Sequence, residues 1–372
     1  MRPIVFNGKF LSAPMTGVHR VAEEVIRAAD DVLAVKERKG ILACPKDAQR
    51  LLPLHNIPHW RVGRLTWQWW EQAELPRMSA LGPLVNLCNL GPIAVRDAVT
   101  MIHDAQVIES PASYSPAFRF YYRAIQPIIA RRHRAMLTVS RYSAEALARH
   151  GVAPSGVIRV AMNGADHVAR TTPDLSAYRR FGLRPGRYVL ALASAQAHKN
   201  IAVLCRAFRD PRLADLTLVL FGGGDIRDID PDPPSNVVPI GRVSDSELFG
   251  LMRSAAAYAC PSLTEGFGLP ALEAMASDCP VVAAPCGALP EVCDDAALYA
   301  APDHSGDWVE ALLRIADEPS LASEMRDKGR ARSSQFRWAD AAATLVQVVD
   351  EMEDARDAEL AHGGRDRHPR PA

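Results

Sequence analysis

Two glutamates flank a glycine-rich turn in the stretch PSLTEGFGLPALEAMASDCPVVAAP, residues 261–285. Glu265 precedes the glycines, and Glu273 follows them in an alanine-rich segment that reads as a helix. Gly266 and Gly268 have no side chain, so the N–H groups of this loop can approach a ligand closely. A loop that leads into a helix N-terminus is a ready site for a phosphate. The stretch therefore predicts a diphosphate site with a carboxylate on either side.

The two carboxylates differ in what they can reach. Glu265 lies ahead of the helix and can extend past the phosphates to a sugar, whereas Glu273 lies about one turn inside the helix and can bind a vicinal diol, as in ribose sites. Pro270 supports the helix start, because proline lacks the N–H that would be unpaired in the first turn. The set indicates a nucleotide-sugar site. Two alternatives stay open: a hydrolytic acid–base pair, and a capped helix with a solvated glutamate.

Two further segments of the second half favour an anionic ligand. In ALASAQAHKN (191–200), an apolar strand and a turn of small residues precede Lys199 at the start of a helix. A lysine there can neutralise a departing diphosphate where no metal is bound. FGGGD (221–225) ends the next strand with three glycines and permits close backbone approach. Each also has a plain structural interpretation, a solvated lysine and an ordinary turn.

The first half offers two loops at strand ends. TGVHR (16–20) follows the first strand and opens a helix, and Gly17 would let this loop face a phosphate across a cleft. IHDAQ (102–106) ends another strand with His103 and Asp104. Ligands bind at the carboxyl ends of such strands, so His103 is a candidate for the site. The residues equally suit a packed histidine with Asp104 capping the next turn.

The elements that must position these residues alternate between short apolar strands and helices. Such alternation predicts an α/β fold with parallel sheets covered on both faces. Helices are expected in GVHRVAEEVIRAAD, YSAEALARHG and VSDSELFGLMRSAA. The expected strands are 4–8, 41–45, 99–104, 135–140, 157–164, 188–194, 216–224, 237–241, 256–262 and 280–285.

Ten strands are too many for one comfortable sheet, and a polar segment rich in Pro, Gly and Arg lies near 168–186. We therefore expect a Rossmann-like domain over 1–168 and a second one over 180–336. The segment 337–353 reads as a helix with apolar spacing. The tail 354–372 has almost nothing to bury and is expected to be disordered.

Composition excludes several classes of protein. Lys+Arg and Asp+Glu number 43 each, so no net charge attracts the chain to nucleic acid. No apolar run reaches the about 18 residues that a membrane span requires, and the N-terminus reads as a strand rather than a signal peptide. The seven cysteines are scattered without a CxxC motif, which favours reduced cysteines over metal ligands or disulfides. We expect a cytoplasmic protein.

With these motifs assembled, the chain resembles family 4 glycosyltransferases. The second half has the family pattern in order: HKN (198–200), LVLFGGG, and a block over 237–292 that includes the E-x7-E signature as Glu265 and Glu273. The first half resembles a bacterial surface-polysaccharide, mannosyltransferase-like subgroup through NGKFLSAPMTGVHR, WEQAELP, TMIHDAQV, LTVSRYSAEAL and VIRVAMNGAD. The resemblance covers about residues 2–350.

The resemblance implies a GT-B architecture, in which two facing Rossmann-like domains enclose the active site. It implies sugar transfer with retention of configuration and without a required metal or cofactor. GDP-mannose is the favoured donor and a UDP-sugar the next, and the acceptor is a growing cell-surface glycan or a lipid-linked oligosaccharide. The helix 337–353 is expected to cross back to the N-terminal domain. The alternatives are a nucleotide-sugar epimerase and a non-catalytic glycan-assembly binding protein.

The resemblance also assigns roles to individual residues. Glu265 would contact hydroxyls of the donor sugar, Lys199 the diphosphate, and His103 the donor sugar near the acceptor; these three form the expected catalytic set. Many relatives have an arginine five residues before the lysine, but here that position is Ser194. Leaving-group stabilisation would then depend more on Lys199. The other expected donor-binding residues are Gly17, Val243 beside the base, Gly266, Phe267, Gly268, and Glu273 at the ribose.

The acceptor side is less defined. FRFYYRAIQPIIARRHRAM (118–136) mixes aromatic residues with arginines and could meet the inner membrane surface or a lipid-diphosphate acceptor; a solvated outer face of a core helix is the alternative. WRVGRLTWQWWEQ (60–72) has four of the six tryptophans, most of which we expect in the core. Arg20 and His103 are the candidate acceptor contacts.

Overall fold

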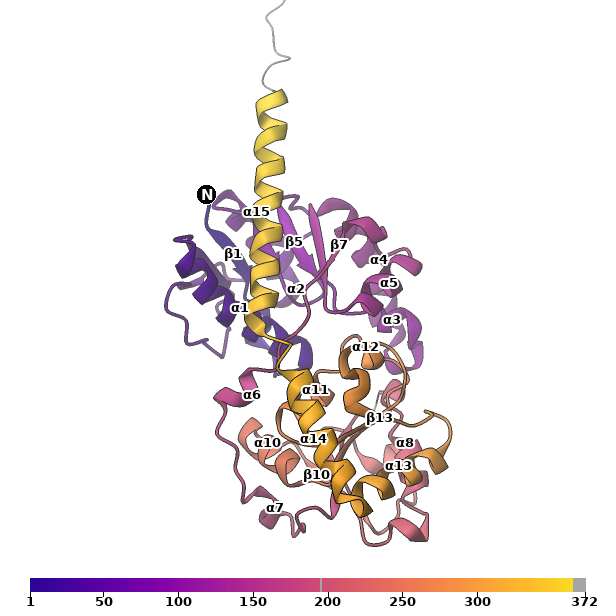
Figure 1. Cartoon of the computed structure of the whole chain (residues 1–372). Coiled ribbons are helices and arrows are strands. Elements are labelled where there is room, and N and C mark those ends of the chain that lie inside the picture. The colour runs from indigo at the N-terminus through magenta and orange to yellow at the C-terminus, as the bar shows by residue number, and fades with distance from the viewer. Residues whose placement is uncertain (195, 364–372) are drawn as a thin grey trace, which may run out of the picture.

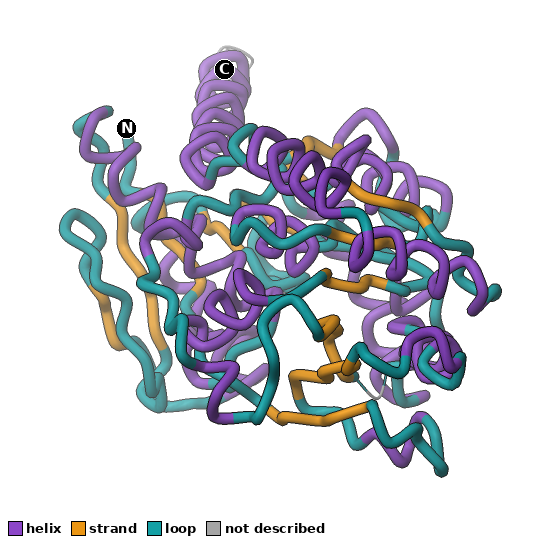
Figure 2. The backbone as a smooth tube through the Cα atoms, turned by 60° about the horizontal axis from the view of Figure 1, so that its bottom comes forward, coloured by secondary structure: helices purple, strands orange, loops and turns teal. Residues whose placement is uncertain are grey.

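The computed structural model describes residues 1–194 and 196–363. These residues form two α/β domains, each built on a parallel sheet (Figure 1). The N-terminal domain lies at the top of that view and the C-terminal domain below it. In the tube view, strands of both sheets lie between layers of helices (Figure 2). The α/β class predicted from the sequence is confirmed.

The N-terminal sheet has seven parallel strands in the order β3-β2-β1-β4-β5-β6-β7. The chain thus begins in the middle of the sheet and winds outward in both directions, so the strand order reverses beside β1. Ligands bind at the carboxyl edge of such a sheet near this reversal. The strands are β1 (Ile4–Asn7), β2 (Gly40–Cys44), β3 (His59–Arg61), β4 (Leu84–Asn86), β5 (Ala98–Met101), β6 (Ala135–Thr138) and β7 (Ile158–Val160).

The C-terminal sheet has six parallel strands in the order β10-β9-β8-β11-β12-β13. Its central strands β8 and β11 are adjacent, and the loops that follow them contain the lysine and the first glutamate of the predicted site. The strands are β8 (Tyr188–Ala193), β9 (Thr217–Gly222), β10 (Val237–Gly241), β11 (Ala257–Cys260), β12 (Val281–Ala283) and β13 (Ala297–Tyr299).

The ten strands expected from the sequence all occur, but β3, β4 and β13 were not predicted. Each of these three has only three residues. Such short segments have few positions to show a periodic pattern; β7 and β12 are equally short, but they lie within the longer runs 157–164 and 280–285 from which strands were expected.

Helices cover both sheets, and two show clear sequence reasons for their starts. In α1, the Thr16 side chain accepts a hydrogen bond from the backbone of His19, and in α10 Ser244 and Glu247 form a capping box. The longer helices are α1 (Gly17–Val35), α4 (Pro116–Arg132), α5 (Arg141–Arg149), α8 (Ile201–Ala207), α10 (Asp245–Ser254), α11 (Leu269–Ala276), α13 (Ser305–Asp317), α14 (Pro319–Ser333) and α15 (Trp338–Gly363). The shorter ones are α2 (Trp67–Trp69), α3 (Gln106–Glu109), α6 (His167–Arg170), α7 (Ala177–Arg180), α9 (Ile226–Ile229) and α12 (Leu289–Cys293).

The last helix, α15, follows α14 of the C-terminal domain and runs across the N-terminal domain, where it packs beside α1 (Figure 1). Its apolar side chains join the core cluster that contains β1 and α1; they are Trp338, Ala341, Ala342, Leu345, Val346, Val348, Val349 and Met352.

The predicted disordered tail is wrong for residues 354–363, which continue α15. The extra turns bury little, but they are tied to the domain by charge. Glu359 accepts two hydrogen bonds from Arg134, at 2.9 and 2.8 Å, and such a bidentate pair is among the stronger charged contacts. Residues 364–372 of the predicted tail lie outside the described residues.

The boundary between the domains lies at about residue 168, as expected, but the second domain starts there and not at 180. Val168, Ala177 and Leu183 belong to the core cluster of the C-terminal sheet, together with Tyr188. The polar composition of this segment reflects its outer face, while its few apolar residues anchor it to the second domain.

Candidate active site

Two adjoining cavities lie between the domains at the carboxyl ends of both sheets. The first has a volume of about 580 Å³ and is lined by both domains. The second has a volume of about 760 Å³ and is lined mainly by the C-terminal domain. Both are bordered by Thr16, Leu192, Gln196 and Lys199, so these residues mark the junction.

Lys199 and Glu265 form a buried ion pair at this junction. Lys199 Nζ donates to Glu265 Oε1 at 2.7 Å, and Ser262 Oγ donates to the same oxygen at 2.6 Å. The two charged side chains are only 16% and 10% exposed. Burial opposes ionisation of both groups, but the pairing prevails: the pKa of Glu265 lies below its ordinary value and the pKa of Lys199 lies above. Both groups are therefore charged at neutral pH.

The loop before α11 is held by the N-terminal domain. The hydroxyls of Ser140 and Ser143 both donate to the carbonyl of Gly266, at 2.6 and 2.9 Å, and Gln106 Nε2 donates to the carbonyl of Thr264 at 3.2 Å. Ser140 is also the N-cap of α5. These bonds fix Glu265 relative to the opposite domain.

Gly266 of this loop has a packing role that the sequence did not show. A Cβ on Gly266 would lie 2.8 Å from Asp104 Cβ and 3.0 Å from the carbonyl oxygen of His103, so this glycine permits the two domains to meet. Gly268 has a φ of +89° and is the N-cap of α11. Gly266, Phe267 and Gly268 all border the first cavity, as expected. The sequence predicted close approach by a ligand, whereas at Gly266 the N-terminal domain occupies that space.

His103 and Asp104 follow β5 and border the first cavity with Glu265. His103 is 5% exposed, and burial lowers its pKa to about 4, so the imidazole is neutral. Its Nε2 lies 2.8 Å from the carbonyl oxygen of Leu87, which can only accept, so Nε2 has the proton and Nδ1 is free to accept. Burial raises the pKa of Asp104 to about 6. The alternative interpretations also hold. His103 is packed in the interior, and Asp104 Oδ1 accepts a hydrogen bond from the backbone N–H of Gln106 in the next turn.

The second cavity contains the residues predicted for the nucleotide. Ser194, Val243 and the three glycines after β9 line it, together with Arg242, which the sequence did not single out. A Cβ on Gly222 would lie 2.6 Å from the carbonyl oxygen of Ala193, and this glycine has a φ of +116°, so no larger residue fits there. Gly17 borders the first cavity from the opposite domain, with open space around its Cα.

Arg20 forms an ion pair with the opposite domain. Its Nη2 donates to Asp245 Oδ1 of α10 across the cleft at 2.6 Å, and it borders the second cavity with Val243. Desolvation of Arg20 is outweighed by Asp245, and its pKa is raised. Arg20 therefore borders the second cavity and is paired with Asp245, a partner that the sequence did not indicate, and its acceptor contact stays a prediction.

Glu273 is not brought to the wall of either cavity. It lies in α11, is 8% exposed, and its Oε1 is 2.9 Å from His167 Nε2. His167 belongs to α6, at the connection between the domains. The sequence gave no signal for this partner, because a single histidine 106 positions away has no recognisable spacing.

An aromatic row that the sequence did not single out as a group follows the first cavity into α4. Tyr114 stacks on Phe118 and Phe118 on Tyr122, with ring centroids 5.5 and 4.1 Å apart, and Tyr114 also stacks on His198 of the opposite domain at 6.4 Å. His198 Nδ1 lies 2.8 Å from Ser113 Oγ. The row thus joins the two domains beside Lys199.

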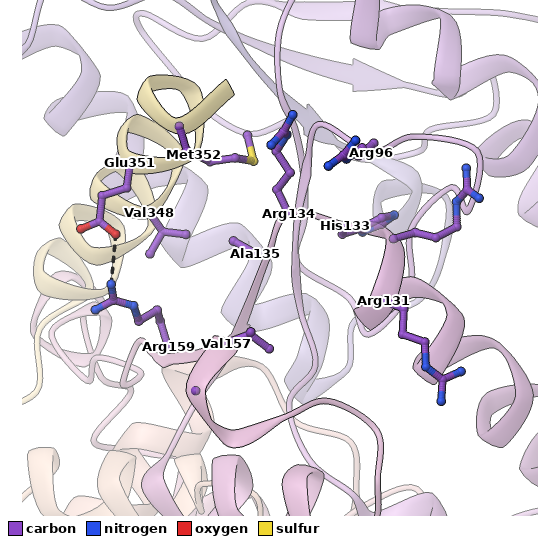
Figure 3. Close-up of a pocket in the computed structure, with 13 residues that line it drawn as sticks. Arg96, Arg131, His133, Arg134, Ala135, Val157, Arg159, Val348, Glu351 and Met352 are labelled. Carbon is purple, nitrogen blue, oxygen red and sulfur yellow. Dashed lines mark hydrogen bonds and ion pairs between the residues drawn. The ribbon is translucent and has the colours of Figure 1, made fainter. Parts of the chain in front are cut away.

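The basic segment 118–136 forms α4 and the loop after it, and its exposed face is both apolar and charged. Phe120 is 78% exposed, whereas Ile125 and Ile129 are buried in the core of the domain. Beyond its C-terminal end, a groove of about 410 Å³ is lined by α15 and five arginines, Arg96, Arg131, Arg132, Arg134 and Arg159 (Figure 3). Arg159 is paired with Glu351 at 3.1 Å across this groove.

The expectation that most tryptophans of 60–72 are core residues is wrong. Trp70 is fully buried, but Trp60, Trp67 and Trp69 are 45%, 66% and 76% exposed. Trp67, Trp69 and Trp70 lie within four consecutive residues, so their side chains cannot all point to the same buried face.

The cysteines, possible metal ligands and possible membrane spans were also considered in the sequence. All seven cysteines are free thiols, as expected, and five of them are buried. In residues 1–194 and 196–363, no group of three or more His, Cys, Asp or Glu side chains gathers as metal ligands would. None of the helices found there is both long enough and apolar enough to span a bilayer.

Comparisons with known proteins show which families the chain is similar to. Residues 186–318 match the family model described as "Glycosyl transferases group 1". An MMP alpha-(1->4)-mannosyltransferase of Mycolicibacterium hassiacum is 30% identical over 276 residues, 69% of this chain and 64% of that protein. The O-antigen chain mannosyltransferase RfbU of Salmonella typhimurium is 26% identical over 63% of this chain and 65% of that protein. The match thus covers less than two thirds of either relative.

Solved structures show the same fold over nearly the whole chain. Sucrose-phosphate synthase from Thermosynechococcus elongatus superposes with a TM-score of 0.73 and 19% identity, covering 95% of this chain and 100% of that one. Anabaena HepE, in complex with UDP and glucose, has a TM-score of 0.72 and 17% identity, covering 94% and 100%. The predicted GT-B architecture is confirmed, and so is the resemblance to family 4 glycosyltransferases and to bacterial mannosyltransferases.

Proposed function

Since the fold is GT-B and residues 186–318 match the glycosyl transferases of group 1, we propose that this protein transfers a sugar from a nucleotide-diphosphate donor to an acceptor hydroxyl. The observation that carries the proposal is the buried Lys199–Glu265 pair at the junction of the two cavities. A cation at that junction suits a diphosphate, and a carboxylate beside it suits the hydroxyls of a sugar.

The donor would lie across both cavities. The nucleotide occupies the second cavity, with its base beside Val243 and its phosphates against the glycines after β9. The sugar enters the first cavity beside Glu265 and His103. Lys199 has three N–H donors on its ammonium group, so it can keep Glu265 and still bind a phosphate oxygen.

The arrangement of Glu265 favours retention of configuration without an enzymic nucleophile. Its Oε1 accepts from both Lys199 and Ser262, which lowers its basicity and holds it as a hydrogen-bond acceptor for the sugar. The acceptor hydroxyl attacks the anomeric carbon from the face that the diphosphate leaves. The C–O bond to the acceptor forms as the bond to the phosphate oxygen breaks, and that oxygen takes the hydroxyl proton.

Positive charge from the protein would stabilise the departing diphosphate, so we propose that no metal is required. Lys199 lies at the junction of the two cavities, and Arg20 and Arg242 border the second cavity. Ser194 stands where many relatives have a second cation, which leaves Lys199 as the main group on the reacting phosphate.

The donor and acceptor follow from the relatives. The Mycolicibacterium and Salmonella proteins are both mannosyltransferases, which favours GDP-mannose, while HepE was solved with UDP and UDP-glucose. RfbU acts on an O-antigen chain, which favours a growing cell-surface glycan or a lipid-linked oligosaccharide as the acceptor. We propose that the enzyme works at the inner face of the cytoplasmic membrane, with the basic and aromatic outer face of α4 toward the lipid.

Thermal unfolding of the purified protein with GDP-, UDP-, ADP- and dTDP-sugars, each with EDTA, tests the donor site. A ligand at 100 times its Kd adds about 2.7 kcal/mol of stability, which shifts the melting temperature by a few degrees. We expect one nucleotide class to give this shift in EDTA. A shift that requires added metal would refute metal independence, and no shift with any donor would refute the proposed function. NMR of the glycosidic product then gives its anomeric configuration.

A further inference from the structure

Glu273 is the end of a buried chain of three side chains that starts in α15. Trp338 Nε1 lies 3.0 Å from His167 Nδ1, and His167 Nε2 lies 2.9 Å from Glu273 Oε1. The three residues are 1%, 3% and 8% exposed. They come from three different segments: the first turn of α15, the connection between the domains, and α11.

The donor and acceptor atoms determine which way the hydrogen bonds run from Trp338 through His167 to Glu273. An indole N–H can only donate, so His167 Nδ1 must accept and has no proton. A neutral imidazole then has its proton on Nε2, which donates to the carboxylate of Glu273. Trp338 therefore selects the tautomer of His167, and that tautomer occupies one oxygen of Glu273.

The backbone around this chain is held by bonds between the two segments that cross between the domains. Asp166 Oδ1 accepts from the backbone N–H of Trp338 at 2.8 Å, and Ala165 N–H donates to the carbonyl of Phe336 at 3.0 Å. A Cβ on Gly164 would lie 2.2 Å from the backbone nitrogen of Trp338, so only glycine fits there. The two crossing segments thus form one block, and the block determines where His167 lies.

We infer that His167 is a positioning residue for the ribose-binding carboxylate: it holds Oε1 of Glu273, turns Oε2 toward the ribose hydroxyls, and is itself set by Trp338. The inference rests on the proposed function and on the diol role that the sequence predicts for Glu273; Glu273 lines neither cavity, but its charge acts on Arg20, which borders the second one. It connects the helix that crosses back to the N-terminal domain with donor binding in the C-terminal domain. A purely structural role for the same bonds would affect stability alone.

The test compares ligands with and without the ribose hydroxyls. Isothermal titration measures the Kd of GDP, UDP and their 2′,3′-dideoxy forms for the wild type and for Trp338→Phe and His167→Asn. The matched control is Trp308→Phe, because Trp308 is also fully buried and donates its Nε1–H once, to the carbonyl of Ala301 at 2.9 Å, outside both cavities.

For the nucleotide that the wild type binds, we expect Trp338→Phe to weaken the ribonucleotide about fivefold and to leave the dideoxy form unchanged, since one neutral hydrogen bond is involved. His167→Asn should show the same dependence on the hydroxyls, and Trp308→Phe should affect neither ligand. Equal losses for both ligands, or no loss, would overturn the inference and leave the proposed function standing. A wild type that binds no nucleotide would overturn both.

A second measurement needs neither variants nor ligand. The imidazole ¹⁵N spectrum of the wild-type protein, assigned to His167 with the help of His167→Asn, should show the tautomer with the proton on Nε2. The tautomer with the proton on Nδ1 would overturn the inference, because Trp338 could then not donate to it.

Discussion

The Lys199–Glu265 pair gives the sharpest prediction for stability. We consider Lys199→Met, Glu265→Gln and the double variant. Lys199→Met leaves a carboxylate that is only 10% exposed, with Ser262 Oγ at 2.6 Å and the weakly donating Cys260 Sγ at 4.0 Å as its remaining donors. Removing one partner of a buried pair costs about 3–5 kcal/mol of the free energy of unfolding, and the remaining bond to Ser262 places the expected loss near the lower value, about 3 kcal/mol.

The double variant should be more stable than either single variant, because it buries no unpaired charge. Urea unfolding followed by circular dichroism measures all four free energies. The matched control is Lys328→Met, which breaks an exposed pair with Glu324 and should leave the unfolding midpoint unchanged. Losses that add within about 0.5 kcal/mol in the double variant would refute the coupling of Lys199 and Glu265.

The pH dependence of the free energy of unfolding of Lys199→Met tests the same ion pair. Glu265 has a pKa below its ordinary 4.5 in the folded protein, because Lys199 and Ser262 outweigh its burial. A carboxyl with a depressed pKa contributes stability above its unfolded pKa and loses it as pH falls through the folded value. The cost of Lys199→Met should therefore be largest at neutral pH and shrink below about pH 4.

Three further predictions concern the proposed reaction and the closure of the cleft. Lys199→Ala should lower the transfer rate ~10²–10³-fold, and Glu265→Gln should lose turnover while GDP or UDP binding is retained; a Glu265→Gln enzyme with wild-type turnover would contradict the proposed role. Gly266→Ala should reduce thermal stability and activity, because its Cβ would lie 2.8 Å from Asp104 Cβ, whereas Gly17→Ala, with open space at its Cα, should melt like the wild type. Burial raises the pKa of Asp104 from 3.8 to about 6, so the wild type should lose stability relative to Asp104→Asn as pH rises between these values; parallel stability profiles for the two proteins would contradict this.

The pattern of neighbouring residues was enough to predict most strands and helices and the chemistry of the glycine-rich loop that contains Glu265. The ten predicted strands, the helix starts at Gly17 and Asp245, and the glycine-flanked helix after Glu265 all depend on neighbouring residues along the chain. The same holds for His103, Asp104, Ser194 and Arg242, which border the cavities in loops that follow strands. Parallel strands bring their carboxyl ends to one edge, so a pattern read strand by strand already gathers the site.

Contacts between distant segments could not be predicted, since no local pattern records them. The loop at Gly266 is held by Ser140 and Ser143 of the other domain, and Arg20 is paired with Asp245 across the cleft. The end of α15 is ordered by Arg134, more than 200 residues away.

What the sequence alone determined is the set of groups in and beside the cleft: Lys199 and Glu265 at the cavities, Glu273 in the helix behind them, and the glycines of the loops. What only the tertiary structure decided is the state of those groups. Lys199 reaches Glu265, and His167 reaches Glu273, because domains that are separate in the chain pack together and exclude water. In that buried setting the partner of each group, and not its place in the motif, determines how its side chain is held, and for Lys199 and Glu265 it also keeps both groups charged.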